Sequence, residues 1–153
     1  MGDRLLFTDA GKRLAAASNA GQTAAKTIEK IELPVLHYNT DRDLLEKENL
    51  KTINEVARLA RTYPEVAVVV QVHTDETGPA KFDLYHGIKR AELAGNALVE
   101  RGVPAARIWL KSFGAAYPVA KNAMGAVPNP VGQRLNRRIE ITLATPGESL
   151  PLD

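Results

Sequence analysis

The chain has 153 residues, of which 44% are hydrophobic and 25% are charged, and these values are typical of one folded domain with a hydrophobic core. Its net charge of +2, without a cluster of basic residues interleaved with aromatic ones, argues against a nucleic-acid partner. The absence of cysteine excludes a disulfide scaffold, thiol catalysis and a cysteine-ligated metal.

The first third of the chain predicts an appendage, a strand and a helix. Residues 1–30 are rich in alanine, lysine and threonine, and we interpret them as a linker or N-terminal appendage. A strand is predicted from Ile31 to Tyr38, with Pro34 tolerated on a sheet edge. Apolar residues recur at helical spacing from Leu44 to Tyr63, which predicts an amphipathic helix.

The middle of the chain predicts a buried strand followed by a second helix. The β-branched run from Val66 to Val72 is typical of a strand buried on both faces, and it is too short to span a membrane. A loop is expected from Thr74 to Phe82. A helix then runs to about Arg101, with Gly87 as its N-cap and a glycine just after its end.

The last third predicts two strands separated by a long loop. The strands are expected at Ala106 to Phe113 and Arg137 to Leu143, the loop runs from Gly114 to Gly132, and residues 146–153 form a flexible tail. The order β-α-β-α-β-β predicts an α/β (α+β) two-layer sandwich. Its mixed four-stranded sheet would carry the helices packed on one face.

Four segments in a fixed order carry a family resemblance. They are HTDETG from residue 73, KRAELAGNALVERGV from residue 89, FGAAYPVAKN from residue 113 and GQRLNRRIEI from residue 132. Together they resemble the OmpA-like C-terminal domain, the peptidoglycan-binding module shared by OmpA, Pal and MotB proteins. The resemblance covers roughly residues 32–144, and we place the domain at residues 31–145.

The resemblance implies a site for meso-diaminopimelate, the diamino acid of peptidoglycan stem peptides. Asp75 would meet its ammonium, and Arg90, fifteen residues later, its carboxylate. With Gly87 as N-cap, Arg90 falls in the first helical turn, where unpaired N–H groups also favour an anion. The opposing interpretation is a surface ion pair between Asp75 and Arg90, worth ~0–1 kcal/mol.

The resemblance places five further residues near this pocket. Thr74 would present a hydroxyl or backbone group, and Asp41 would line the rim or serve as a turn residue. Asp83 replaces the usual asparagine and, when ionised, cannot donate a hydrogen bond. Asn136 would lie beside the binding loop, and Arg137 would face the glycan or water.

The predicted function is non-covalent binding of peptidoglycan through stem-peptide diaminopimelate, which would anchor an envelope protein to the cell wall. We expect no metal, because the three histidines lack zinc-site spacing. We expect no catalysis and no cofactor, because no nucleophile elbow, P-loop or dinucleotide fingerprint is present. The family usually has glycine where Val72 stands and Leu-Ser where His86-Gly87 stands. These departures, with Asp83, keep an alternative open: a scaffold or protein-interaction module of a motor or secretion complex, with a degenerate pocket.

The resemblance also implies a cellular setting. We expect a periplasmic domain whose export signal and outer- or inner-membrane anchor lie upstream of this sequence, because no signal peptide is visible after Met1. Contact with a membrane would occur only through that missing anchor. Family members often pair through this domain, which leaves a homodimer open.

Overall fold

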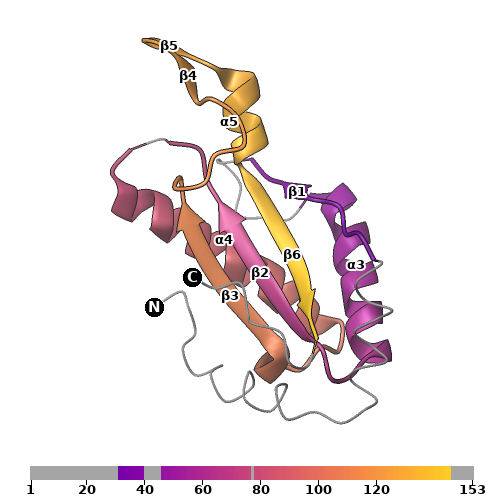
Figure 1. Cartoon of the computed structure of the whole chain (residues 1–153). Helices are drawn as coiled ribbons and strands as arrows, with labels where there is room; N and C mark the ends of the chain where they lie inside the picture. The colour runs from indigo at the N-terminus through magenta and orange to yellow at the C-terminus, as the bar shows by residue number, and fades with distance from the viewer. Residues whose placement is uncertain (1–30, 40–45, 77, 146–153) are drawn as a thin grey trace.

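The computed structural model of the chain describes residues 31–39, 46–76 and 78–145 (Figure 1). Its main sheet has four strands in the order β1-β6-β2-β3. Strand β2 is parallel to β3 and antiparallel to β6, and β6 is antiparallel to β1. The strands are β1 (Leu36–His37), β2 (Ala67–His73), β3 (Ile108–Gly114) and β6 (Arg138–Ala144).

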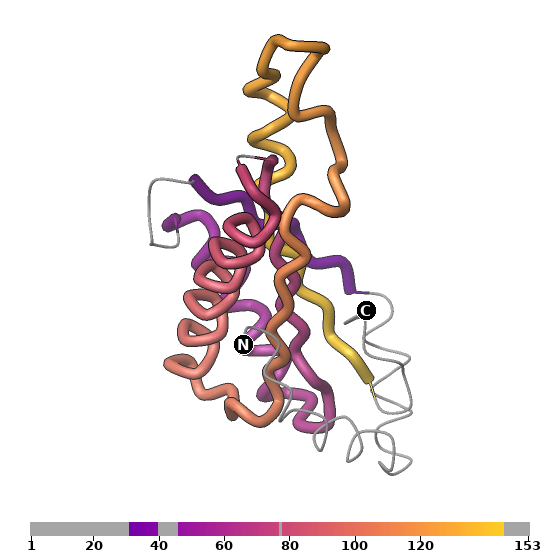
Figure 2. The backbone as a smooth tube through the Cα atoms, turned by 90° about the vertical axis from the view of Figure 1, so that its left-hand side faces the viewer, coloured from indigo at the N-terminus to yellow at the C-terminus, as the bar shows by residue number. Residues whose placement is uncertain are grey.

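Two long helices, α3 (Lys47–Thr62) and α4 (Ala80–Glu100), lie on the same face of this sheet (Figure 2). Their apolar sides and the facing strand residues form the hydrophobic core. The expected two-layer sandwich with a mixed four-stranded sheet is therefore confirmed. Within the described ranges, no helix is long and apolar enough to cross a bilayer.

The first strand is shorter than predicted. Only Leu36 and His37 pair with β6, whereas we expected a strand from Ile31 to Tyr38. Proline has no N–H group for a sheet ladder, so Pro34 cannot extend the pairing. Strand β3 likewise starts two residues later than expected, because η2 (Ala105–Arg107) forms a 3₁₀ turn before it.

Helix α4 begins earlier than the sequence predicts, and the N-cap role expected for Gly87 is wrong. The N-cap is Pro79, and Gly87 lies buried within the helix. A Cβ atom at Gly87 would overlap the Ser112 side chain on β3, so the glycine allows helix and strand to approach closely. Arg90 consequently lies about three turns into α4, away from the unpaired N–H groups of the helix start.

The end of α4 follows the sequence prediction. Gly102 adopts a φ of 91°, and its N–H donates to Val99 O at 3.0 Å. The Val103 N–H donates to Leu98 O at 3.1 Å, which completes a Schellman motif. Val103 and Leu98 are both buried, so the turn also closes the core at this end.

The long loop expected from Gly114 to Gly132 contains regular structure. It holds a two-stranded hairpin, β4 (Ala123–Met124) and β5 (Val127–Pro128), and then the helix α5 (Pro130–Asn136). Gly125 supplies the positive φ of 66° at the hairpin tip. We call residues 115–136 the arm, and Figures 1 and 2 show it projecting beyond the end of the main sheet.

Candidate functional site

Thr74 and Asp75, two of the residues implied by the family resemblance, lie at the carboxyl end of β2. This strand lies between β6 and β3, and the chain leaves it at His73. The Thr74 N–H still donates to Gly114 O at 2.9 Å, which ties the following loop to the end of β3. Thr74 and Asp75 are therefore held by the sheet rather than by a long surface loop.

Asp75 is paired with Arg137. Arg137 Nη1 donates to Asp75 Oδ2 at 2.6 Å, and only 3% of Asp75 is exposed. Arg137 immediately precedes β6, which is the neighbour of β2 in the sheet. The strand order thus places a guanidinium on the carboxylate that was expected to meet a ligand ammonium.

Arg90 is packed against an aromatic ring. Its Cζ atom lies 5.2 Å from the centroid of the Tyr38 ring, and its Nη2 donates to Asn39 O at 3.4 Å. Only 4% of Arg90 is exposed. A cation above an aromatic face is attracted by the ring quadrupole by ~0.5–2 kcal/mol, so the stacked guanidinium is held in one orientation.

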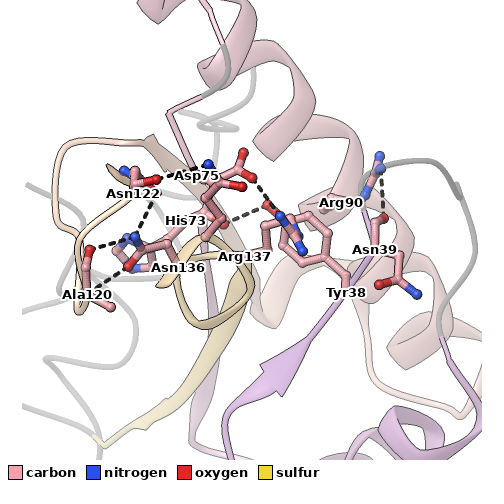
Figure 3. Close-up of polar contacts among 10 residues, drawn as sticks. Tyr38, Asn39, His73, Asp75, Arg90, Ala120, Asn122, Asn136 and Arg137 are labelled. Carbon is pink, nitrogen blue, oxygen red and sulfur yellow. Dashed lines mark hydrogen bonds and ion pairs between the residues drawn. The ribbon is translucent and has the colours of Figure 1, made fainter. Parts of the chain in front are cut away.

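Tyr38 is at the centre of the site, and the sequence analysis did not identify it. Its hydroxyl donates to His73 O at 2.6 Å (Figure 3). Burial raises the pKa of Tyr38 above its ordinary value, and the positive charge of Arg90 opposes that rise. The charges of Asp75, Arg137 and Asp83 also act on this hydroxyl.

Four charged side chains thus act electrostatically on one phenol hydroxyl. We call Tyr38, Asp75, Asp83, Arg90 and Arg137 the Tyr38 cluster. Asp83 lies in the first turn of α4 and is buried, so four separate parts of the chain contribute to the cluster. The structure brings together four of the predicted residues. The only signal for Tyr38 in the sequence was its place as an aromatic residue at the end of a predicted strand.

Thr74 adds a buried polar atom beside the Tyr38 cluster. Among the residues that the structure describes, none forms a hydrogen bond with its Oγ1 atom. A buried hydroxyl without a partner costs about 1–3 kcal/mol, so such groups are uncommon and call for an explanation. A guest that bonds this hydroxyl would remove that cost.

The side-chain amide of Asn136 bonds to residues of the arm. It is 0% exposed, and its Oδ1 accepts from the N–H groups of Val119 at 2.8 Å and Ala120 at 3.1 Å. Its Nδ2 donates to Ala120 O at 2.8 Å and to Asn122 Oδ1 at 2.9 Å. The amide therefore holds the arm (Figure 3). Asp41 lies outside the described residues.

Two cavities border the loop after Asp75. One, of about 560 Å³, lies between Glu76 and residues 118–123 of the arm. The other, of about 410 Å³, is lined by Glu76 and Asp83 together with residues 113–116. Asp83 thus connects the Tyr38 cluster with a cavity at the surface.

The chemistry of this site is that of charge recognition. The charges of two carboxylates and two guanidinium groups act on one buried hydroxyl, and these charges come from strand ends and from helix α4. A carboxylate accepts several hydrogen bonds, and a guanidinium can hold a carboxylate in a bidentate manner. Among the described residues, no group of three histidine, aspartate or glutamate side chains is arranged to hold a metal ion.

The fold is a mixed four-stranded sheet with two helices packed on one face. The model of the OmpA family matches residues 37–129, and the chain belongs to that family.

Two curated relatives illustrate the similarity. Outer membrane porin F of Pseudomonas fluorescens is 30% identical over 114 residues, which cover 74% of this chain and 33% of that protein. The peptidoglycan-associated lipoprotein of Agrobacterium fabrum is 32% identical over 85 residues, which cover 56% of this chain and 48% of that protein. The chain therefore spans from about a third to about half the length of these relatives.

Solved structures show the same fold. The peptidoglycan-associated lipoprotein of Burkholderia pseudomallei superposes with a TM-score of 0.64 at 25% identity, covering 71% of this chain and 88% of that one. The C-terminal domain of Helicobacter pylori MotB also reaches 0.64, at 22% identity, and covers 74% of this chain and 86% of that one. The second likeness concerns the fold alone.

Proposed function

We propose that residues 31–145 bind peptidoglycan non-covalently and anchor an envelope protein to the cell wall without catalysing a reaction. Family membership supports this proposal, as does the similarity to a peptidoglycan-associated lipoprotein. One further relative is the peptidoglycan-binding protein ArfA of Mycobacterium bovis, 29% identical over 106 residues, which cover 69% of this chain and 31% of that protein.

The proposed ligand group is the free end of meso-diaminopimelate. Its ammonium and carboxylate share one carbon, so it needs an anion and a cation close together. The observation that carries the proposal is the Tyr38 cluster: Arg90 stacks on the Tyr38 ring, and the Tyr38 hydroxyl donates to the carbonyl of His73, two residues before the buried Asp75. Asp75 would accept from the ammonium, and Arg90 would hold the carboxylate.

Binding would require an exchange of partners at Asp75. Its carboxylate already accepts from Arg137, and Asp75 itself is almost fully buried. We propose that the ligand ammonium shares or replaces this contact, and that Arg137 then turns toward the ligand carboxylate. Opposite charges stay paired throughout, which avoids the several kcal/mol that a lone buried charge costs. The hydroxyl of Thr74 would gain a partner in the same step.

The proposed location is the periplasm. Relatives described as an outer membrane porin and as the periplasmic domain of Helicobacter pylori MotB support it. The domain could act as a monomer or as a homodimer, and sedimentation velocity of the purified chain distinguishes the two.

The direct test measures ligand binding by charge-removing variants of similar shape. Asp75→Asn and Arg90→Gln are each expected to weaken calorimetric binding of free meso-diaminopimelate by about 30-fold or more, since removing one partner of a buried charge pair costs at least ~2 kcal/mol. Both variants should also stop pelleting with purified sacculi. Glu100→Gln on α4 and Lys51→Gln on α3 are exposed charge controls and should bind normally. Unchanged binding by both site variants would refute the site.

One observation favours the alternative of a scaffold module with a degenerate pocket. The contact between Arg137 and Asp75 occupies the carboxylate that the ligand needs. If this contact is permanent, a stem peptide containing diaminopimelate gives no heat at millimolar concentration while circular dichroism shows an intact fold. Saturable heat under the same conditions excludes the alternative.

A further inference from the structure

The arm exposes an unusual amount of apolar surface. Of the large hydrophobic side chains that are exposed in the described part of the chain, more than half lie on the arm. They are between 45% and 65% exposed, and they comprise Tyr117, Val119, Met124, Val127, Val131 and Leu135. A concentration of this kind usually marks a contact surface rather than a face that only meets water.

The arm also carries charge of one sign. No aspartate or glutamate occurs between Glu100 and Glu140, so every ionised side chain of the arm is a cation. Lys121 and Arg134 are both exposed there. The surface therefore complements a partner that presents carboxylates and apolar groups together.

The arm is built as a fixed platform. Asn136 holds residues 119–122 through the four hydrogen bonds of its buried amide. Gln133 Nε2 also donates to Asn122 O at 3.0 Å, and Asn129 Nδ2 donates to Lys121 O at 2.9 Å. A Cβ atom at Gly132 would overlap the Lys121 carbonyl, so α5 packs tightly on this segment. A preordered surface loses little conformational entropy when it binds.

The arm is continuous with the candidate site. Asn136 and Arg137 are adjacent residues, and the first holds the arm while the second holds Asp75 (Figure 3). The cavity of about 560 Å³ spans the gap between Glu76, next to Asp75, and the arm. A polymer whose diamino acid entered the Tyr38 cluster would meet the arm on the way out.

We infer that the arm is a second contact surface for the cell-wall polymer, beyond the diaminopimelate group. This inference rests on the proposed function. Stem peptides carry free carboxylates, which suit Lys121 and Arg134, and N-acetylated sugars present apolar ring faces and methyl groups, which suit Met124 and Val127. Two sites on one polymer bind together more tightly than either alone.

The test compares the small ligand with the intact polymer. The double variants Met124→Ser/Val127→Ser and Lys121→Gln/Arg134→Gln are measured for binding to free meso-diaminopimelate and to purified sacculi. Each is expected to bind the amino acid like the unaltered chain and to lose about tenfold in affinity for sacculi. The loss from the charge variant should shrink at high salt, because salt screens exposed charges.

Matched controls lie away from the arm. Val99→Ser removes an apolar side chain that is 44% exposed near the end of α4, and Lys51→Gln removes an exposed charge on α3. Both should bind sacculi normally, and all variants should keep the melting temperature because the altered side chains are exposed.

Each remaining outcome decides against the inference in a distinguishable way. Unchanged binding to sacculi by both arm variants overturns it and leaves the diaminopimelate site standing. Arm-dependent binding to vesicles of anionic lipid, with no loss on sacculi, assigns the surface to a membrane instead. Failure of the unaltered chain to bind either the amino acid or sacculi overturns the proposed function and the arm inference together.

Discussion

The buried pair between Asp75 and Arg137 makes the sharpest prediction about this domain. Replacing Arg137 with methionine keeps much of the volume but removes the guanidinium that donates to Asp75 at 2.6 Å. Asp75 is 3% exposed, so its charge would stay buried without that partner. Breaking a buried pair in this way costs about 3–5 kcal/mol.

We expect a value near the lower end of this range. The side chain of Arg137 is 16% exposed, so the pair is not fully shielded from water. A loss of ~3 kcal/mol is a large part of the 5–15 kcal/mol by which domains are stable, and it lowers the melting temperature by roughly 10 °C.

The pairwise energy is measured with a double-mutant cycle. Asp75→Asn/Arg137→Met removes both charges, so it should be less destabilised than the sum of the single variants by about 2 kcal/mol. Urea unfolding followed by circular dichroism gives the four free energies of unfolding. A coupling energy within ~0.5 kcal/mol of zero would contradict the reasoning, because it is the value of an exposed surface pair.

Three further predictions follow from the same structure. Gly87→Ala should destabilise the domain by ~1–3 kcal/mol, because the new methyl group would clash with Ser112. The same change at an exposed helical glycine would stabilise a protein by up to ~1 kcal/mol, so the sign of the shift in thermal unfolding decides between the two. The raised pKa of Tyr38 means that, as the pH rises, the folded state keeps the phenolic proton where the unfolded state loses it. The contribution of Tyr38 to the free energy of unfolding is therefore complete below pH ~10 and is lost as the pH rises above it. Urea unfolding between pH ~8 and ~11 should show a flatter decline of that free energy for Tyr38→Phe than for the unaltered chain, and an equal decline excludes this role. Asn136→Ala removes the clamp on the arm, and hydrogen exchange of the Val119 and Ala120 amides should accelerate by at least about tenfold, while unchanged protection shows that other contacts hold the arm.

Local patterns in the sequence predicted most of the fold. The spacing of Ile53, Val56 and Ala60 marks the buried side of α3, and the β-branched run in β2 marks a strand that is covered on both faces. Gly102 marks the end of α4 because a left-handed residue is needed there. Such features depend on near neighbours in the chain, so they can be recognised without knowing what packs against them.

The start of α4 was missed because its buried side is not apolar. The first two turns bury Asp83 and Gly87, while Phe82, Leu84 and Tyr85 are exposed. The buried side of this segment is therefore polar or lacks a side chain, and its apolar residues do not follow a helical period. A helix whose inner face serves a charged site cannot be found from hydrophobic periodicity.

The partners within the site were decided by the tertiary structure. The family motif singled out Asp75, Arg90 and Arg137, yet the pairing of Asp75 with Arg137 joins residues 62 positions apart. It exists because β6 lies beside β2, with Arg138 in register with His73. Tyr38 reaches the same point only because its strand lies on the other side of β6. The sequence by itself determined which charges this domain carries and in which succession its helices and strands follow along the chain. The positions of the strands within the sheet determined which of those charges meet, because contacts between distant residues depend on how the elements pack.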